Sequence, residues 1–168
     1  MLSERQAGLD NLIHDEMAPG FLGLLLGSLV ERLVEDGSEP AQAAGITAPL
    51  RSFSMLLLLS RADQSVTELA RRLGVTHAAV IKTSRVLERS GLVCRGEDPD
   101  DARRKPLCLT PAGRTQSLRI EAYMQRANAV YADLFAEIGV DLFAAARAFE
   151  AALIKESFGH RLSRTEMP

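Results

Sequence analysis

The feature that most constrains this chain is a pair of short amphipathic segments separated by a glycine. The first segment, LARRLGV, contains Gly74, a residue type that readily adopts a positive φ and ends a helix. Thr76 then serves as the N-cap of a second segment, HAAVIKTSRVLERS, which continues to Gly91. The spacing predicts two helices, the first capped by Thr67, that are joined by a tight Gly-Val-Thr turn.

Two apolar segments, LVCRGE and KPLCLT, follow the second helix and flank the polar stretch DPDDARR. This pattern predicts an antiparallel β-hairpin. If Val93 lies opposite Leu109 across the ladder, Cys94 lies opposite Cys108. The order helix, turn, helix, hairpin is that of a winged helix-turn-helix.

The second helix of this motif has two unlike sides. With Val80 placed toward the core and about 100° per residue, Leu87 falls beside it. The opposite side combines a small residue near the helix start with cations further along: Ala78, Lys82, Arg85 and Arg89. A helix in a DNA major groove needs this order, because small residues allow close approach and long ones reach bases or phosphates. A solvated basic face explains the wheel equally well, but the adjacent glycine turn and charged hairpin favour DNA recognition.

The predicted hairpin tip carries acidic residues followed by cations. A wing needs a cation that enters the narrow minor groove, where the potential is most negative. Arg103 and Arg104 can supply it, and Asp101 is close enough to orient the Arg103 guanidinium. For Asp98 and Asp100 a role in solubility is favoured.

The uneven distribution of charge agrees with a polyanion partner. The net charge is −2, yet residues 61–116 hold eleven basic against seven acidic residues, and the remainder holds nine against fifteen. A basic middle between acidic flanks indicates one face for nucleic acid, although ordinary scatter also produces such a difference.

The flanking segments are apolar with helical periodicity. A helix is expected over residues 21–35, apolar on both sides up to Val30 and therefore covered on most sides, with a break at residues 36–40. A short helix then begins at Pro40 and ends near Gly45, and an earlier one is expected over residues 9–17. The remaining expected elements are a helix capped by Thr47 that reaches Ser60, a long helix from Pro111 to Glu137, a helix over residues 140–157, and a loose tail from Gly159.

These patterns predict a mainly α fold with a small β-hairpin wing. The winged helix-turn-helix DNA-binding domain spans residues 47–114, and N- and C-terminal dimerisation helices flank it at residues 1–46 and 115–168. The terminal helices carry more apolar surface than one winged domain can cover, which predicts a homodimer.

Residues 66–114, from VTELARRLGV to CLTPAGR, resemble the MarR-type regulators of bacteria and archaea. The spacing from Thr76 to Gly91 fits that family without a gap. The wing matches a D-x-R motif at Asp101 and Arg103, and Leu109 begins the closing L-T-x-x-G motif. The preceding helix, AGITAPLRSFSMLLLLS, is similar more loosely.

The resemblance implies a homodimer whose outer helices interlock and whose two winged domains straddle a palindromic operator on double-stranded DNA. It implies a transcriptional regulator, with a repressor favoured, that a small aromatic or lipophilic ligand releases. It places Lys82 at a DNA-contacting position, with His77 and Ala79 near the groove, Arg103 in the minor groove and Asp101 as its partner. The full set of expected DNA-binding residues is Thr67, Thr76, His77, Ala78, Ala79, Lys82, Arg85, Arg89, Asp101, Arg103 and Arg104.

A ligand crevice is expected between the dimer helices and the winged domain, with Leu25, Phe53 and Met55 as lining residues. The same three residues are also good core residues, and for each one alone a core position is favoured.

Other function classes receive less support. Two Cys and three His cannot build a four-ligand Cys-rich zinc site, and two Cys are too few to staple 168 residues, so no metal and a reducing cytoplasm are expected. No phosphate loop, catalytic triad pattern or H-E-x-x-H motif is visible, so neither an enzyme nor a cofactor is expected. The longest apolar run, residues 21–30, is too short to cross a bilayer.

Two alternatives stay open. One is a winged-helix protein-interaction module that does not bind DNA. The other is a thiol-based redox sensor that uses Cys94 and Cys108, although a role for both as small apolar side chains is favoured.

Overall fold

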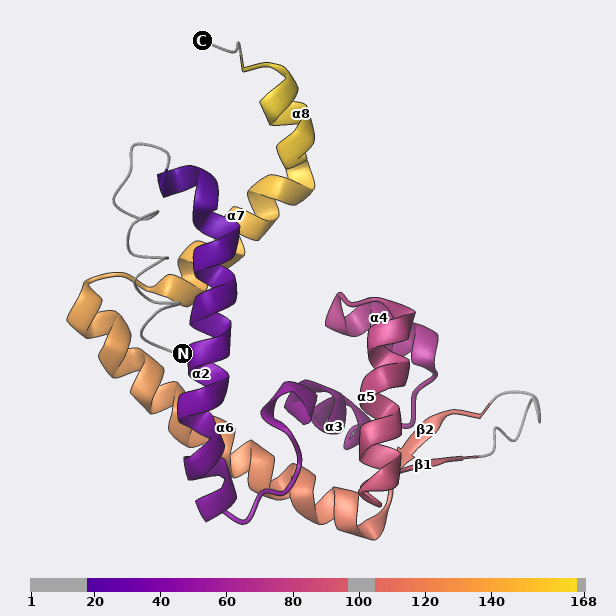
Figure 1. Cartoon of the computed structure of the whole chain (residues 1–168). Helices are drawn as coiled ribbons and strands as arrows, with labels where there is room; N and C mark the ends of the chain where they lie inside the picture. Colours follow the sequence, from indigo (N-terminus) through magenta and orange to yellow (C-terminus); the bar gives the residue numbers. More distant parts are fainter. Residues whose placement is uncertain (1–17, 97–104, 166–168) are drawn as a thin grey trace, which may run out of the picture. The chain divides into compact units, whose positions relative to one another are not determined.

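The computed structural model describes residues 18–96 and 105–165, and the helix expected over residues 9–17 lies outside this part (Figure 1). Two compact units divide at Tyr123 and Met124. The first holds η1 (Ala18–Phe21), α2 (Leu22–Ala43), η2 (Leu50–Ser52), α3 (Phe53–Leu59), α4 (Val66–Leu73), α5 (His77–Arg89), β1 (Val93–Arg95), β2 (Leu107–Leu109) and the start of α6 (Pro111–Ile138). The second holds the rest of α6, α7 (Leu142–Lys155) and α8 (Phe158–Ser163). The mainly α fold with a small hairpin is confirmed. Among the described helices, none has the length and apolar character needed to span a membrane.

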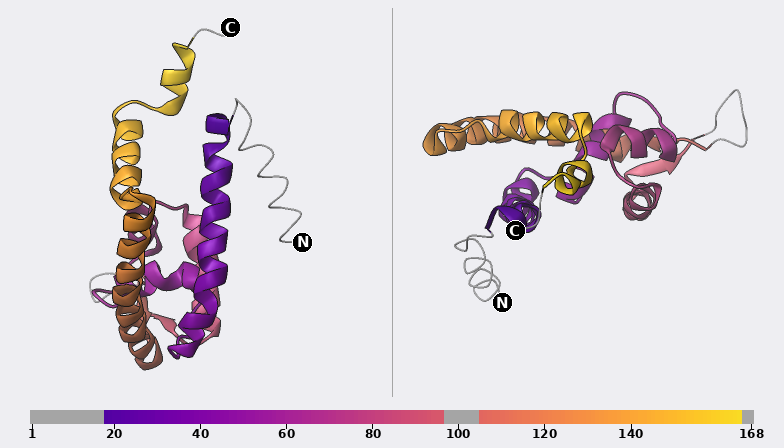
Figure 2. Two further views of the ribbon diagram at one scale, coloured as in Figure 1. Left: turned by 90° about the vertical axis from the view of Figure 1, so that its left-hand side faces the viewer. Right: turned by 90° about the horizontal axis from the view of Figure 1, so that it is seen from above.

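The break expected at residues 36–40 is wrong, as is the separate helix starting at Pro40. Helix α2 runs without interruption to Ala43 with Pro40 inside it (Figure 2). Proline in a helix interior loses a hydrogen bond and crowds the preceding turn. Contacts from distant segments hold this stretch: the Tyr123 hydroxyl donates to the Gly37 carbonyl at 3.1 Å. A Cβ at Gly37 would lie 2.7 Å from Leu50 Cδ2, so a larger residue there requires Leu50 to move.

The chain alone does not cover α2, so the expectation that this helix is covered on most sides stays a prediction. Six large apolar side chains of α2 remain exposed: Leu22, Leu24, Leu25, Leu26, Val30 and Leu33. Only Ala41 of α2 is buried.

Thr47 does not cap the next helix, which begins later, as a 3₁₀ turn at Leu50. The backbone between α2 and η2 is instead satisfied by α6. The Gln116 side-chain oxygen accepts from the Thr47 amide at 2.8 Å, and its amide group donates to the Gly45 carbonyl at 3.1 Å. Arg119 donates to the same carbonyl at 2.6 Å. These bonds give the Thr47 amide and the Gly45 carbonyl their partners, so α6 holds the segment between α2 and η2.

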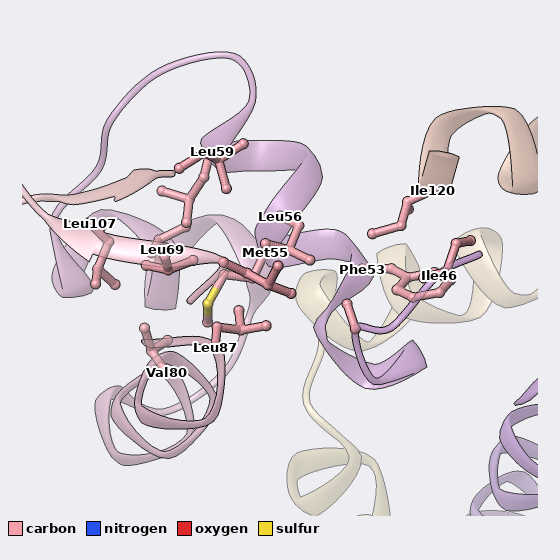
Figure 3. Packing of buried hydrophobic residues seen from close by; sticks show 14 of the residues in the cluster. Ile46, Phe53, Met55, Leu56, Leu59, Leu69, Val80, Leu87, Leu107 and Ile120 are labelled. Atoms are coloured by element: carbon pink, nitrogen blue, oxygen red, sulfur yellow. The ribbon is translucent and has the colours of Figure 1, made fainter. Parts of the chain in front are cut away.

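The core of the first unit lies where α3, α4, α5, the hairpin and α6 meet (Figure 3). Each element contributes at least one fully buried apolar side chain: Leu56, Leu69, Leu87, Leu107 and Ile120. Phe53 at the start of α3 packs edge-on against Tyr123, with ring centroids 5.9 Å apart. The helix-turn-helix therefore rests on a filled apolar core.

The N-cap of α4 is Ser65 rather than the predicted Thr67. The Ser65 hydroxyl accepts from the Glu68 amide at 3.2 Å, and the Glu68 carboxylate accepts from the Ser65 amide at 2.8 Å. This reciprocal capping box satisfies two N-terminal amides at once and so outcompetes a single threonine cap. At the other end, Gly74 has φ 66°, as predicted for the residue that ends the helix.

Helix α5 begins and ends as its sequence predicts. The Thr76 hydroxyl accepts from the Ala79 amide at 3.2 Å, and Gly91, just beyond the helix, has φ 69°. Val80, Ser84 and Leu87 are buried, so the predicted core side of the wheel is confirmed.

The hairpin has the register set out above, with Val93 opposite Leu109 and Cys94 opposite Cys108. The L-T-x-x-G motif that follows has a packing reason. The Thr110 hydroxyl donates to the Gly91 carbonyl at 2.6 Å and accepts from the Gly113 amide at 3.0 Å, which caps α6. A Cβ at Gly113 would lie 2.0 Å from the Leu92 carbonyl oxygen, so only glycine lets α6 start against the hairpin.

The described part of the second unit consists of the end of α6, α7 and α8 joined by short turns, and it contains no buried residue. Helix α7 starts at Leu142 because the Asp141 carboxylate accepts from the Ala144 amide at 2.9 Å. The loose tail expected from Gly159 is wrong, since α8 forms there with Ser157 as its N-cap. Arg161 ties α8 to α7 by donating to the Ala152 carbonyl at 3.0 Å.

Candidate nucleic-acid interface

The start of α5 presents small and polar residues to solvent. Thr76, His77, Ala78 and Ala79 are all exposed. A hydrogen bond of 3.2 Å between His77 Nε2 and Thr67 Oγ1 connects the first turns of α5 and α4. The structure thus brings together the two helix starts that the sequence assigned to DNA contact.

The predicted row of cations is present along the outer side of α5. Lys82, Arg85 and Arg89 are exposed, on the side opposite the buried Val80 and Leu87. Arg89 Nε donates to the Arg85 carbonyl at 3.2 Å, which holds the Arg89 side chain along the helix. The buried residues on one side of α5 therefore turn this row of cations toward solvent.

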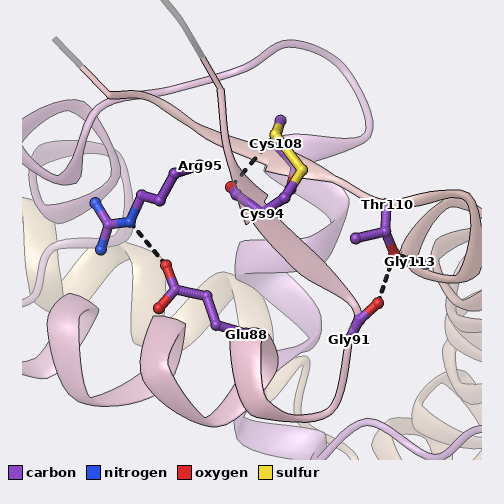
Figure 4. The surroundings of a disulfide bond; sticks show 7 residues. All are labelled: Glu88, Gly91, Cys94, Arg95, Cys108, Thr110 and Gly113. Atoms are coloured by element: carbon purple, nitrogen blue, oxygen red, sulfur yellow. Dashed lines mark hydrogen bonds and ion pairs between the residues drawn. A yellow bond between two sulfur atoms is a disulfide. The ribbon is translucent and has the colours of Figure 1, made fainter.

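An open hollow lies on this side of α5, and its lining mixes apolar and charged side chains: Ala78, Ile81, Lys82, Arg85, Val86, Glu88 and Arg89. The one carboxylate in the lining, Glu88, already has a partner, because Arg95 Nε on β1 lies 2.7 Å from its Oε1 (Figure 4). The paired Glu88 opposes the cation row less than a free carboxylate would. Three cations against one paired carboxylate make this surface of α5 positive, which suits an anionic partner.

Sequence reasoning missed this pair. Glu88 and Arg95 are seven residues apart and belong to different elements, so neither a helical nor a strand period connects them. Their ion pair fixes the hairpin base to the end of α5. Arg95 is the charged residue of a predicted wing strand, two residues after Val93 and so on the same face of the hairpin, and that position was the signal that could have pointed to it.

The predicted wing-tip residues Asp101, Arg103 and Arg104 lie outside the described residues, and their roles stay predictions. The strands that lead to them are described, and Lys105 next to β2 is exposed.

The three residues predicted to line a ligand crevice are not gathered at one cavity in the described part of the chain. Phe53 and Met55 belong to the core cluster, with exposed fractions of 6% and 2%. Leu25 is 40% exposed on α2 and is not part of that cluster. Their ligand role stays a prediction.

The interpretation of Cys94 and Cys108 as two small apolar side chains is wrong. Their register places the two sulfurs together, and the structure joins them in a disulfide with Cα atoms 5.2 Å apart (Figure 4). Within residues 18–96 and 105–165, no group of three or more His, Cys, Asp or Glu side chains is arranged to hold a metal ion.

Comparison with known proteins identifies the family. Residues 44–104 match a family model described as the MarR family. The HTH-type transcriptional repressor Rv2887 of Mycobacterium tuberculosis is 33% identical over 118 residues, which cover 70% of this chain and 81% of the relative. The repressor Mb2911 of Mycobacterium bovis matches to the same extent.

Solved structures agree with this match. The transcriptional repressor CouR, bound to a 23-mer DNA duplex, is 26% identical, with a TM-score of 0.62 over 83% of this chain and 96% of CouR. The adhesin competence repressor AdcR of Streptococcus pyogenes, at 21% identity and a TM-score of 0.58 over 80% of this chain and 96% of AdcR, supports the fold alone. With helix, glycine turn, helix and hairpin in the family's order and a relative matched over most of its length, the chain belongs to the MarR family of transcriptional regulators.

Proposed function

We propose that this protein is a homodimeric, DNA-binding repressor of transcription that acts in the cytoplasm and carries out no enzymatic reaction. The observation that carries the proposal is the cation row of α5, exposed on the side opposite the core residues of the same helix. CouR, a relative of similar fold, is itself a repressor bound to DNA.

In this proposal α5 lies in the major groove. Ala78 and Ala79 at its start permit close approach, and the longer Lys82 and Arg85 reach bases or phosphates further along. Thr67 and His77 sit at the adjoining helix starts and contact the sugar-phosphate backbone, since amides and hydroxyls at helix N-termini suit phosphate oxygens. Arg103 on the wing enters the minor groove with Asp101 as its partner.

The partner of the exposed apolar helices is a second copy of the chain. Support comes from the number of large apolar side chains that stay exposed on three helices: Leu24, Leu25 and Val30 on α2, Phe143, Phe149 and Ile154 on α7, and Phe158 and Leu162 on α8. Apolar surface that recurs along three helices in this way is typical of an obligate interface. A two-fold dimer presents two α5 helices to two half-sites, which makes the operator palindromic.

A small aromatic or lipophilic ligand that lowers DNA affinity completes the proposal. Leu25 is exposed on α2, whereas Phe53 and Met55 are buried around α3. A ligand that contacts all three must therefore shift α3, and with it the support of α5. Linkage then requires DNA to weaken ligand binding by the same factor.

The test is a gel-shift titration with a labelled duplex from the region directly upstream of the protein's own coding sequence. Lys82→Ala is expected to weaken binding by about 1–3 kcal/mol. Arg126→Ala on α6 removes an equal charge from an exposed position outside α5 and is expected to bind like the wild type. Wild-type affinity for Lys82→Ala would contradict the placement of α5, and no binding by the folded wild type would favour a protein-interaction module instead.

The same titration with salicylate and other aromatic acids tests release. A decrease in DNA affinity with rising ligand supports the repressor-release mechanism. Binding of the ligand without any change in DNA affinity would contradict it.

A further inference from the structure

We propose that Cys94 and Cys108 form a reversible dithiol–disulfide site in the wing, which a hydroperoxide oxidises and which raises DNA affinity when oxidised. The effect on DNA rests on the proposed function, whereas the chemistry of the site does not. The chain contains only these two cysteines, so every thiol reaction of the protein belongs to this pair.

The backbone holds the two residues together. Two interstrand hydrogen bonds flank the pair, one on each side: the Thr110 amide to the Leu92 carbonyl at 3.1 Å, and the Gly96 amide to the Pro106 carbonyl at 2.8 Å. Because such bonds alternate along an antiparallel ladder, Cys94 and Cys108 occupy a hydrogen-bonded pair position. Their Cα separation of 5.2 Å lies within the range that a disulfide requires.

Burial on the other face of the hairpin makes this register independent of the disulfide. Val93, Leu107 and Leu109 are buried in the core, and a slip by one residue would turn them to solvent. The cysteines therefore point to the opposite face, where both are half-buried and accessible to a small oxidant. In the reduced protein the two thiols remain neighbours.

The reaction balances in two steps. A cysteine thiolate attacks the hydroperoxide oxygen, the O–O bond breaks, and the alkoxide takes up a proton to leave as an alcohol while the cysteine becomes a sulfenic acid. The second thiol attacks that sulfur, the S–O bond breaks, and water leaves. Two thiols are oxidised to one disulfide, and one hydroperoxide is reduced to alcohol and water.

The hairpin is tied to the recognition helix, so a change in the hairpin reaches α5. Arg95, next to Cys94, pairs with Glu88 of α5 at 2.7 Å, and Thr110, two residues after Cys108, donates to the Gly91 carbonyl at 2.6 Å. The disulfide fixes the two strands that carry these contacts. A DNA-contacting surface that is already ordered loses less conformational entropy when it binds DNA. We therefore expect oxidation to raise DNA affinity by about 3- to 10-fold.

The experiment compares reduced and cumene hydroperoxide-treated full-length protein. Free thiols are counted with a chromogenic disulfide reagent and the intact mass is recorded. DNA affinity is measured on the same samples with the duplex described above. Oxidation is expected to remove both thiols with loss of two hydrogen atoms, to leave the chain unlinked to a second copy, and to be reversed by dithiothreitol.

Three outcomes overturn parts of the proposal separately. Retention of both thiols, or a disulfide between two chains, contradicts the site itself. Equal affinity of the two redox forms contradicts the regulatory effect, while failure of both forms to bind DNA contradicts the proposed function instead. Cys94→Ser with Cys108→Ser is the matched control and is expected to bind like the reduced wild type under both conditions. Circular dichroism of this variant checks its fold.

Discussion

In the winged part of the first unit, Leu56 of α3, Leu69 of α4 and Leu87 of α5 are fully buried in one core. In the second unit, Phe143 is 69% exposed and Ile154 is 81% exposed. Both regions are helical and rich in apolar residues, so composition does not separate them. The difference lies in whether the chain itself covers its apolar surface: it does so in the winged region and leaves that surface exposed in the second unit.

Polar contacts differ in the same way. In the winged region, side chains bond to backbone groups far away in the sequence: Gln116 of α6 donates to the Gly45 carbonyl. In the second unit, most contacts join neighbours in sequence, such as Arg147 with Glu150 at 2.6 Å. Exposed ion pairs of this kind contribute little stability.

The largest effect is expected from opening the winged core. Leu69→Ala removes a fully buried side chain and is expected to lower the free energy of unfolding by about 2–5 kcal/mol. Ile154→Ala, measured in a chain made monomeric by Phe143→Asp, is expected to change it by less than about 0.5 kcal/mol. Urea denaturation followed by circular dichroism gives both values, and equal losses would remove the distinction between the two regions.

The next effect concerns the uncovered surface. Phe143→Asp is expected to weaken the dimer by at least the burial free energy of one aromatic side chain, about 1.5–3 kcal/mol per protomer. Light scattering after gel filtration should then give the mass of one chain at concentrations where the wild type gives two. Gln125→Asp adds the same charge at an exposed polar position of α6 and is expected to stay dimeric. A wild type that is itself a stable monomer would rule out the proposed interface.

A smaller effect is expected at the wing. Arg103→Ala is expected to weaken DNA binding by about 1–3 kcal/mol and to make its salt dependence shallower by about one charge. Titrations at several salt concentrations, with the fold checked by circular dichroism, give the slope. An unchanged affinity and slope would show that the wing does not contact DNA through this residue.

The smallest effect is expected at a helix cap within the DNA-binding region. Ser65→Ala removes one half of the capping box and is expected to cost about 0.5–2 kcal/mol of stability. Thr67→Ala, two residues later, is not at the cap and is expected to cost less, while still changing the contact with His77. Thermal unfolding of both variants measures the two losses of stability. A larger loss for Thr67→Ala than for Ser65→Ala would show that Thr67 is the cap.

Local patterns in the sequence were sufficient for the winged motif. Gly74 ends one helix and Thr76 caps the next, and both act on residues within one helical turn. The apolar pattern of the two wing segments places Val93 opposite Leu109 on the neighbouring strand. The core side of α5 followed from the helical period alone, and so did its outward row Lys82, Arg85 and Arg89. The sequence by itself therefore determined the fold class, the family resemblance and the face proposed to contact DNA.

Tertiary structure decided what depends on residues far apart in the chain. Helix α2 passes through Pro40, and three residues earlier Tyr123, 86 residues after Gly37, donates to the Gly37 carbonyl. Local propensity carries no information about that contact. Gln116, 69 residues after Thr47, accepts from the Thr47 amide, a contact that is equally invisible to local propensity. The Glu88–Arg95 pair required α5 and β1 to be placed side by side, since its energy depends on a distance that no periodicity encodes. The strand register predicted that Cys94 lies opposite Cys108, but the bond between them was seen only in the structure.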